Sequence, residues 1–100
     1  MRKLVALFQR HGSRWDESRP VREQALWDEH ARFVDALHEA GKIVLAGPFA
    51  DGSGSLVILR ADSAEEVRAL FRDDPWARED ILVAADVKEW TIFVDGRDEP

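Results

Sequence analysis

The sequence contains no cysteine and no tyrosine, and it has a single methionine among 100 residues. Without thiols the chain cannot form disulfides, thiolate metal sites or a cysteine nucleophile. Basic residues are also scarce, since 14 Lys and Arg stand against 20 Asp and Glu, giving a formal charge of −6. This balance argues against nucleic-acid binding, because neutralising phosphates needs a basic surface.

Long apolar runs are missing as well. The N-terminal run from Leu4 to Phe8 is shorter than the core of a signal peptide, and no later run could span a bilayer. The apolar fraction of 45% is ordinary for a folded protein and too high for a disordered one. We therefore expect a soluble, cytoplasmic chain with one domain over residues 1–94 and a polar tail over residues 95–100.

Apolar patterning and turn residues together predict four strand regions and two helices. Leu4–Phe8 is apolar on both faces, which favours a strand inside a sheet. A first helix is expected from near Ser18, with Pro20 in its first turn, to Gly41. The remaining elements are a hairpin from Ile43–Ala46 and Leu56–Leu59, a helix from Ser63 that Pro75 ends, and a final strand or strand pair within residues 81–94.

The element order β-α-β-β-α-β predicts an α+β, ferredoxin-like fold, in which two helices cover one face of a four-stranded antiparallel sheet. The open face of such a sheet should carry alternating polar residues, but Ile43–Ala46 and Leu56–Leu59 show almost no alternation. Something must cover that face, and a second copy of the sheet is the simplest cover. We therefore expect a homodimer packed sheet to sheet, with a buried ligand as the alternative cover.

His30 is the most informative position. It lies on one helical stripe with four apolar residues: Leu26, Phe33, Leu37 and Ala40. One interpretation is a core histidine bonded to a backbone carbonyl, and the other is a pocket histidine that accepts and donates protons. Arg22 is expected on the same helical stripe, one turn before Leu26.

Asp74 is the second unusual position. Carboxylates are disfavoured at the end of a helix, yet Asp73 and Asp74 follow the second helix directly. Asp73 is explained by a solvated turn in which it acts as a cap or pairs with Arg72. Pro75 restricts the backbone of Asp74, and a carboxylate there that reached His30 would orient the ring as the acid of a catalytic triad does.

Other candidates are weaker. No two histidines have metal-ligand spacing, so we expect neither a metal site nor a cofactor. Gly47-Pro48 either ends a strand or presents backbone N–H groups to a pocket. Four tryptophans are candidates either for an apolar ligand cavity or for packing: Trp15, Trp27, Trp76 and Trp90.

Several segments, taken in order, resemble the YciI-like (YCII-related) family. They are Trp27-Asp28-Glu29-His30, the stretch from Ala40 to Ala46-Gly47-Pro48, Asp73-Asp74-Pro75-Trp76, and Val87-Lys88-Glu89-Trp90. The resemblance covers roughly residues 3–94. It implies a dimeric α+β barrel whose site holds a His–Asp pair, here His30 and Asp74, and at least one relative is a dehydrochlorinase acting on a chlorinated aromatic. Many relatives carry arginine where this chain has Trp27, and Arg22 is the candidate to replace it.

These observations predict a cofactor-independent acid–base enzyme that eliminates or isomerises a small unsaturated or aromatic acid. His30 would move the proton, and Asp74 would orient the His30 ring. The substrate-binding candidates are Arg22, Trp27, Gly47, Pro48 and Trp76. The expected partners are a second copy and a small molecule, without nucleic acid or membrane. The alternatives are a non-catalytic ligand-binding or regulatory module on the same dimeric barrel and a cofactor-free monooxygenase.

Overall fold

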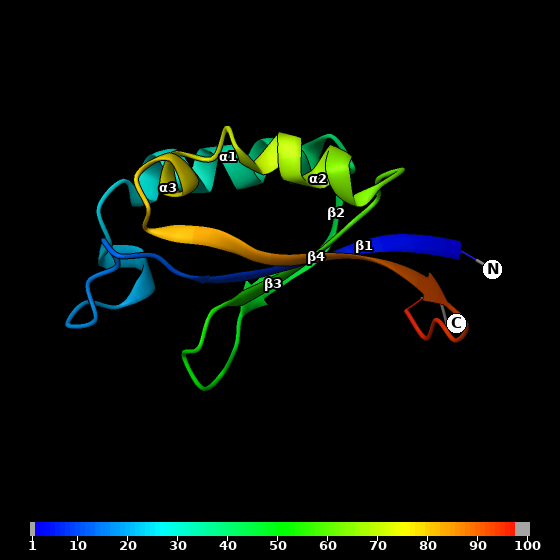
Figure 1. The fold of residues 1–100 in the computed structure, drawn as a ribbon, viewed down its shortest axis with the longest axis horizontal. Coiled ribbons are helices and arrows are strands. Elements are labelled where there is room, and N and C mark those ends of the chain that lie inside the picture. Colours follow the sequence, from blue (N-terminus) through cyan, green and yellow to red (C-terminus); the bar gives the residue numbers. More distant parts are fainter. Residues whose placement is uncertain (1, 98–100) are drawn as a thin grey trace.

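A computed structural model describes residues 2–97, and within them four strands form one antiparallel sheet (Figure 1). The strands are β1 (Arg2–His11), β2 (Ile43–Pro48), β3 (Ser55–Leu59) and β4 (Leu82–Ile92), in the spatial order β2-β3-β1-β4. β1 therefore lies inside the sheet, as its apolar sequence predicts. The α+β, ferredoxin-like fold class is confirmed.

The helices gather on one face of this sheet, as Figure 1 shows. They are α1 (Trp27–Glu39), α2 (Ala64–Phe71) and the single turn α3 (Pro75–Arg78), preceded by a short 3-10 turn, η1 (Val21–Glu23). The capping signal at Ser63 is confirmed, because its hydroxyl accepts a hydrogen bond from the Glu66 N–H at 3.1 Å. α3 was not predicted. α2 already ends at Phe71, ahead of Pro75, and Pro75 instead suits the first position of a new helical turn, where no N–H is needed.

The predicted start of the first helix is wrong. α1 begins at Trp27 rather than near Ser18, and the Ser18 hydroxyl donates instead to the Asp16 carboxylate at 2.6 Å. The buried side chain of Gln24 explains the difference. It accepts from the Asp16 N–H at 2.9 Å and donates to the carbonyls of Asp16 at 2.7 Å and Arg19 at 2.9 Å. These bonds hold the backbone of residues 16–19 in a loop rather than a helix.

Side chains of β1 alternate between two apolar layers. Val5 and Leu7 belong to the core between sheet and helices, where α2 contributes Val67 and Phe71. Leu4 and Ala6 face the other side, where they pack with Ile58 of β3. The sheet is therefore apolar on both faces, as the missing alternation in the sequence predicts.

The face without helices leaves large apolar side chains in solvent. Leu45 is 59% exposed and Trp90 is 50% exposed. Asp95, Gly96 and Arg97 line a hollow on this face together with Leu4, so the described part of the tail lies against the sheet. Residues 98–100, which belong to the predicted tail, lie outside the described residues. Among residues 2–97 no helix is both long enough and apolar enough to cross a membrane.

Gly54 lies at the end of the turn between β2 and β3, where a side chain would not fit. Its φ is +150°, and a Cβ there would lie 2.1 Å from the backbone oxygen of Gln9. We expect Gly54→Ala to lower the free energy of unfolding by about 2 kcal/mol or more, because backbone must move. Gly47→Ala, where a Cβ meets nothing within 4 Å, is the control and should change it by less than about 0.5 kcal/mol. Urea denaturation measures both, and equal stability of the two variants would show that no such clash limits residue 54.

Candidate functional site

The fold brings His30 and Asp74 together from positions 44 residues apart. His30 lies in the first turn of α1, and its Nδ1 is 3.0 Å from both carboxylate oxygens of Asp74. The His30 side chain is 11% exposed and that of Asp74 is fully buried. A carboxylate can only accept hydrogen bonds, so in the neutral ring the proton belongs on Nδ1 and the lone pair on Nε2.

Trp76 holds both members of this pair in place. Its backbone N–H donates to Asp74 Oδ1 at 2.9 Å, so Asp74 also caps α3. Its indole ring stacks on the imidazole of His30, with centroids 3.8 Å apart and planes 6° from parallel. The indole N–H donates to the Ala25 carbonyl at 2.7 Å. The plane of the imidazole is therefore fixed by stacking and its rotation by the Asp74 carboxylate.

His30 borders a cavity of about 240 Å³, hereafter the main cavity. Its walls come from α1, the end of α2, α3, the strands and the segments before α1 and between β2 and β3. The lining residues fall into aromatic side chains (Trp15, Trp27, Phe71, Trp76), the polar residues Gln9, His11 and Ser55 beside His30, residues of the hairpin (Gly47, Pro48, Gly52, Gly54) and aliphatic positions. Within the described part of the chain, the lining contains no lysine, arginine, aspartate or glutamate.

Four of the predicted binding residues lie around this cavity: Trp27, Gly47, Pro48 and Trp76. Arg22 does not. It is exposed in η1, so the prediction that it shares the helical line of His30 is wrong, and its position gives no support to a role in binding. The cause is the late start of α1, which leaves Arg22 outside that helix.

Two further residues can now be placed: one decides between the alternatives left open for the tryptophans, and the other has a different partner from the one expected. Trp90 is the one of the four tryptophans that does not line the main cavity, because it points from β4 to the open face of the sheet. Asp73 pairs with Arg78 of α3 at 3.0 Å rather than with Arg72. Sequence patterning did not foresee α3, and so it did not foresee this partner.

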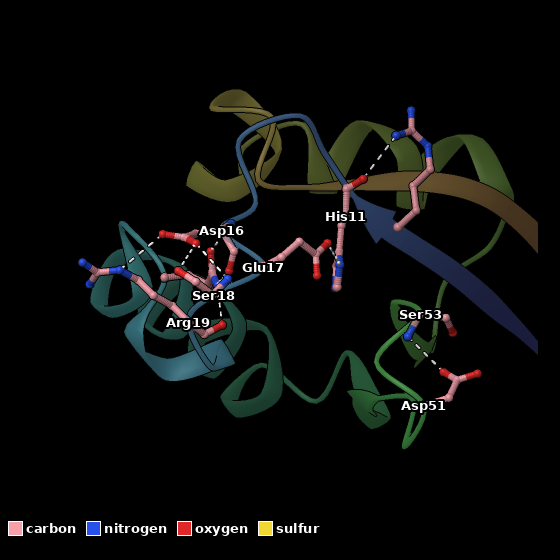
Figure 2. Close-up of polar contacts among 9 residues, drawn as sticks. His11, Asp16, Glu17, Ser18, Arg19, Asp51 and Ser53 are labelled. Carbon is pink, nitrogen blue, oxygen red and sulfur yellow. Dashed lines mark hydrogen bonds and ion pairs between the residues drawn. The ribbon is translucent and has the colours of Figure 1, made fainter.

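Gln9, His11 and Ser55 also line the cavity, and sequence patterning missed all three. β1 continues to His11, and its helix-facing positions run Val5, Leu7, Gln9, His11, so the alternation itself carried the signal. The His11 ring stacks on Trp15 with centroids 3.9 Å apart, and its Nδ1 is 3.5 Å from Glu17 Oε1 (Figure 2). A second imidazole thus lines the cavity that His30 borders.

Short polar bonds hold the loops around the main cavity (Figure 2). Hydrogen bonds from the Ser18 hydroxyl and N–H keep the pKa of Asp16 below its usual value, and those from Ser53 do the same for the pKa of Asp51. Ser13 bonds the Asp80 carboxylate through its N–H at 2.9 Å and through its hydroxyl, which lowers the pKa of Asp80. These three carboxylates are charged at neutral pH. None of them is part of the lining of the main cavity.

Metal binding has no support in this geometry. Among residues 2–97, histidine and acidic side chains do not come together in groups of three or more that could hold an ion.

Comparison with known proteins agrees with the fold. The chain is 35% identical over 63 residues to the uncharacterized protein YjpA of Bacillus subtilis (strain 168), covering 63% of this chain and 67% of that protein. It shares its fold with the 5-chloro-2-hydroxyhydroquinone dehydrochlorinase of Burkholderia phenoliruptrix AC1100, solved with 2,5-dihydroxybenzoquinone. That similarity has a TM-score of 0.60 and 24% identity, and it covers 88% of this chain and 93% of the other. Residues 7–91 match the YCII-related domain, so the chain belongs to that family, as its motifs predict.

Proposed function

We propose that this protein is a cofactor-independent enzyme that moves a proton on a small planar compound, with His30 as the base. The observation that carries the proposal is the two-sided environment of the His30 ring. Its Nδ1 is anchored 3.0 Å from the Asp74 carboxylate, while its Nε2 has no hydrogen-bond partner among the described residues and the ring borders the main cavity. A histidine that served packing alone would need no such cavity.

The proposed chemistry follows from the tautomer. Nε2 takes a proton from a carbon or hydroxyl of the substrate, and the Asp74 carboxylate stabilises the imidazolium that forms. In an elimination, the electrons of the broken bond to hydrogen form a double bond, and the leaving group departs with the electron pair of its own bond. His30 then releases its proton to water. In an isomerisation, His30 returns the proton at another position. Proton transfer of this kind contributes roughly 10²–10⁴-fold in rate.

The walls of the cavity favour a flat ring with oxygen substituents. Trp27 is partly exposed and offers an aromatic surface, whereas Trp76 supports the ring of His30 by stacking on it. Gly47 and Pro48 allow a ligand to approach the end of β2 closely. A volume of about 240 Å³ suits a single-ring compound. Because neither lysine nor arginine is among the described residues of the lining, no counter-charge awaits a carboxylate, and we propose a hydroxylated ring. The dehydrochlorinase of similar fold, solved with 2,5-dihydroxybenzoquinone, supports this class.

Replacing His30 tests the catalytic role. His30→Asn keeps an amide N–H for Asp74 but lacks a base, so we expect turnover to fall at least about 100-fold with the fold intact. Chloride release from 5-chloro-2-hydroxyhydroquinone and from related chlorinated phenols measures it. His38→Asn is the matched control, since His38 lies exposed on the same helix and should leave turnover unchanged.

Turnover that survived in His30→Asn would refute the assignment. If the wild-type chain bound such rings without converting any of them, and His30→Asn kept the same affinity, the alternative of a non-catalytic ligand-binding module would replace it.

Asp74→Asn tests the orienting role separately. Asparagine still caps α3 by accepting from the Trp76 N–H, which turns its NH₂ group toward His30 and favours a proton on Nε2 instead of Nδ1. We expect turnover to fall about 10³–10⁴-fold, as expected of a base held in the wrong tautomer. Two-dimensional ¹H–¹⁵N spectra of the imidazole should show Nδ1–H in the wild type and Nε2–H in the variant. An unchanged tautomer would show that Asp74 does not set it.

We further propose that the open face of the sheet is covered by a second copy of the chain. Support comes from the large apolar side chains there, with Leu45 and Trp90 at least half exposed although both project from strands of the sheet. Two such sheets can pack face to face about a two-fold axis, so that each buries the same residues of the other.

Charge on that face should separate the copies. We expect Leu45→Glu combined with Trp90→Glu to convert a dimer into a folded monomer in analytical ultracentrifugation, because the new charges would be buried without partners. Glu65→Lys with Arg68→Glu, on the exposed side of α2, is the control and should stay dimeric. A wild-type chain that sediments as a monomer at micromolar concentration would contradict the proposal.

A further inference from the structure

The chain contains two buried glutamines whose environments differ. Gln24 is 4% exposed, and its side-chain amide makes three hydrogen bonds to the backbone of the loop before α1. Gln9 is 7% exposed, yet its amide has no hydrogen-bond partner among the described residues. An amide that bonds nothing in the protein contributes no hydrogen bond to the fold, so Gln9 needs another explanation than packing.

Gln9 occupies a helix-facing position of β1. It follows Leu7 by two residues, so its side chain shares the side of the sheet on which Leu7 packs beneath the helices. Its pairing partner on β3 is Ser55, which also lines the main cavity. Gln9 lines this cavity and a second one, of about 250 Å³, that shares Phe71 and Leu82 with it.

The amide of Gln9 is accessible from these cavities. In the described residues no buried side-chain nitrogen or oxygen is both sealed from solvent and without a partner. Since the Gln9 amide has no partner, its atoms must be reachable from open space, and the two cavities are the spaces it lines. The group is therefore free to bond a molecule that enters.

A β-bulge lies beside this position. Phe8 pairs with Asp86 of β4, whereas Gln9 pairs with Ala84, so Ala85 is an extra residue in β4. Bulges are common next to active sites, where they redirect side chains and interrupt pairing. Here the shift sets the small side chain of Ala84 opposite Gln9, and Ala84 lines the second cavity.

We propose that Gln9 is a specificity-determining residue that hydrogen-bonds an oxygen substituent of the ligand in the main cavity. This rests on the proposed function, in that the main cavity is the ligand site. A side-chain amide both donates and accepts, so it binds a hydroxyl or a carbonyl, and it carries no charge to favour a carboxylate. His30 and Gln9 line the same cavity, and the proposal is that one ring substituted with oxygen contacts both.

A stability comparison tests the unpartnered state of Gln9 without any ligand. Gln9→Leu replaces an amide that bonds nothing in the protein with an apolar side chain of similar volume, so we expect the Tm to rise. Gln24→Leu is the matched control and should lower the Tm, because it leaves the backbone groups of Asp16 and Arg19 without their partner. A fall in Tm for Gln9→Leu as large as that for Gln24→Leu would assign Gln9 a structural role and overturn the proposal.

A binding comparison tests the contact itself, with hydroquinone and p-xylene as probes of similar shape that differ in their hydroxyl groups. NMR titration should show that the wild type binds hydroquinone more tightly, with shifts in the Gln9 side-chain NH₂ signals. Gln9→Leu should weaken hydroquinone binding up to about tenfold and leave p-xylene binding unchanged or stronger. Equal changes for both probes, or no binding of hydroquinone by the wild type, would overturn the assignment.

These measurements involve no turnover. If the Gln9 results hold while His30→Asn keeps full activity, the catalytic proposal alone fails. If His30→Asn behaves as expected while Gln9→Leu distinguishes neither probe, the assignment of Gln9 alone fails.

Discussion

The buried carboxylate of Asp74 is the group on which the site depends. A charge with no exposure is tolerated only when its hydrogen bonds are made, and Asp74 has two partners, the Nδ1 of His30 and the N–H of Trp76. One partner belongs to α1 and the other to α3, so the same carboxylate caps a helix, joins two elements and sets the tautomer of the imidazole. Trp76 then packs with Ile81 and Leu82 in an apolar cluster that Trp15 and Trp27 border. Pair and cluster thus form one unit at the end of the sheet.

Local rules explain which parts of this arrangement can be predicted from the sequence. The strands and the capping signal of Ser63 follow from patterning over a few residues, and His30 is conspicuous because a titratable ring interrupts an apolar stripe. Asp74 is conspicuous because a proline follows it. The residue at which α1 begins is not determined by the local sequence. It depends on Gln24, whose amide reaches back to the backbone of Asp16 and Arg19, and a pattern of helix-compatible residues from Ser18 onward contains no sign of that contact.

Gln9 and His11 were missed for a different reason. The run from Leu4 to Phe8 is apolar on both faces, so it hides the period of two that would sort its residues by side. Once pairing with β3 shows that Leu7 opposite Val57 faces the helices, Gln9 opposite Ser55 must do the same. The polar residues begin where the sheet extends beyond the main core and reaches the cavity. The register between two strands shows which face of the sheet each residue occupies, and the sequence of β1 alone does not show it.

The strongest support for the proposal that this cavity binds a ligand is the contrast between polar groups bonded within the protein and polar groups left open to the cavity. Asp74, Gln24 and the indole N–H of Trp76 all have partners within the protein. Among the described residues, the Nε2 of His30 and the amide of Gln9 have none, and both residues line the same cavity. Among the described residues neither group is sealed from solvent, so neither is a packing defect, but neither contributes a hydrogen bond to the fold. Polar groups that are left open together in one cavity, beside aromatic walls, support the proposal that a ligand completes their hydrogen bonds.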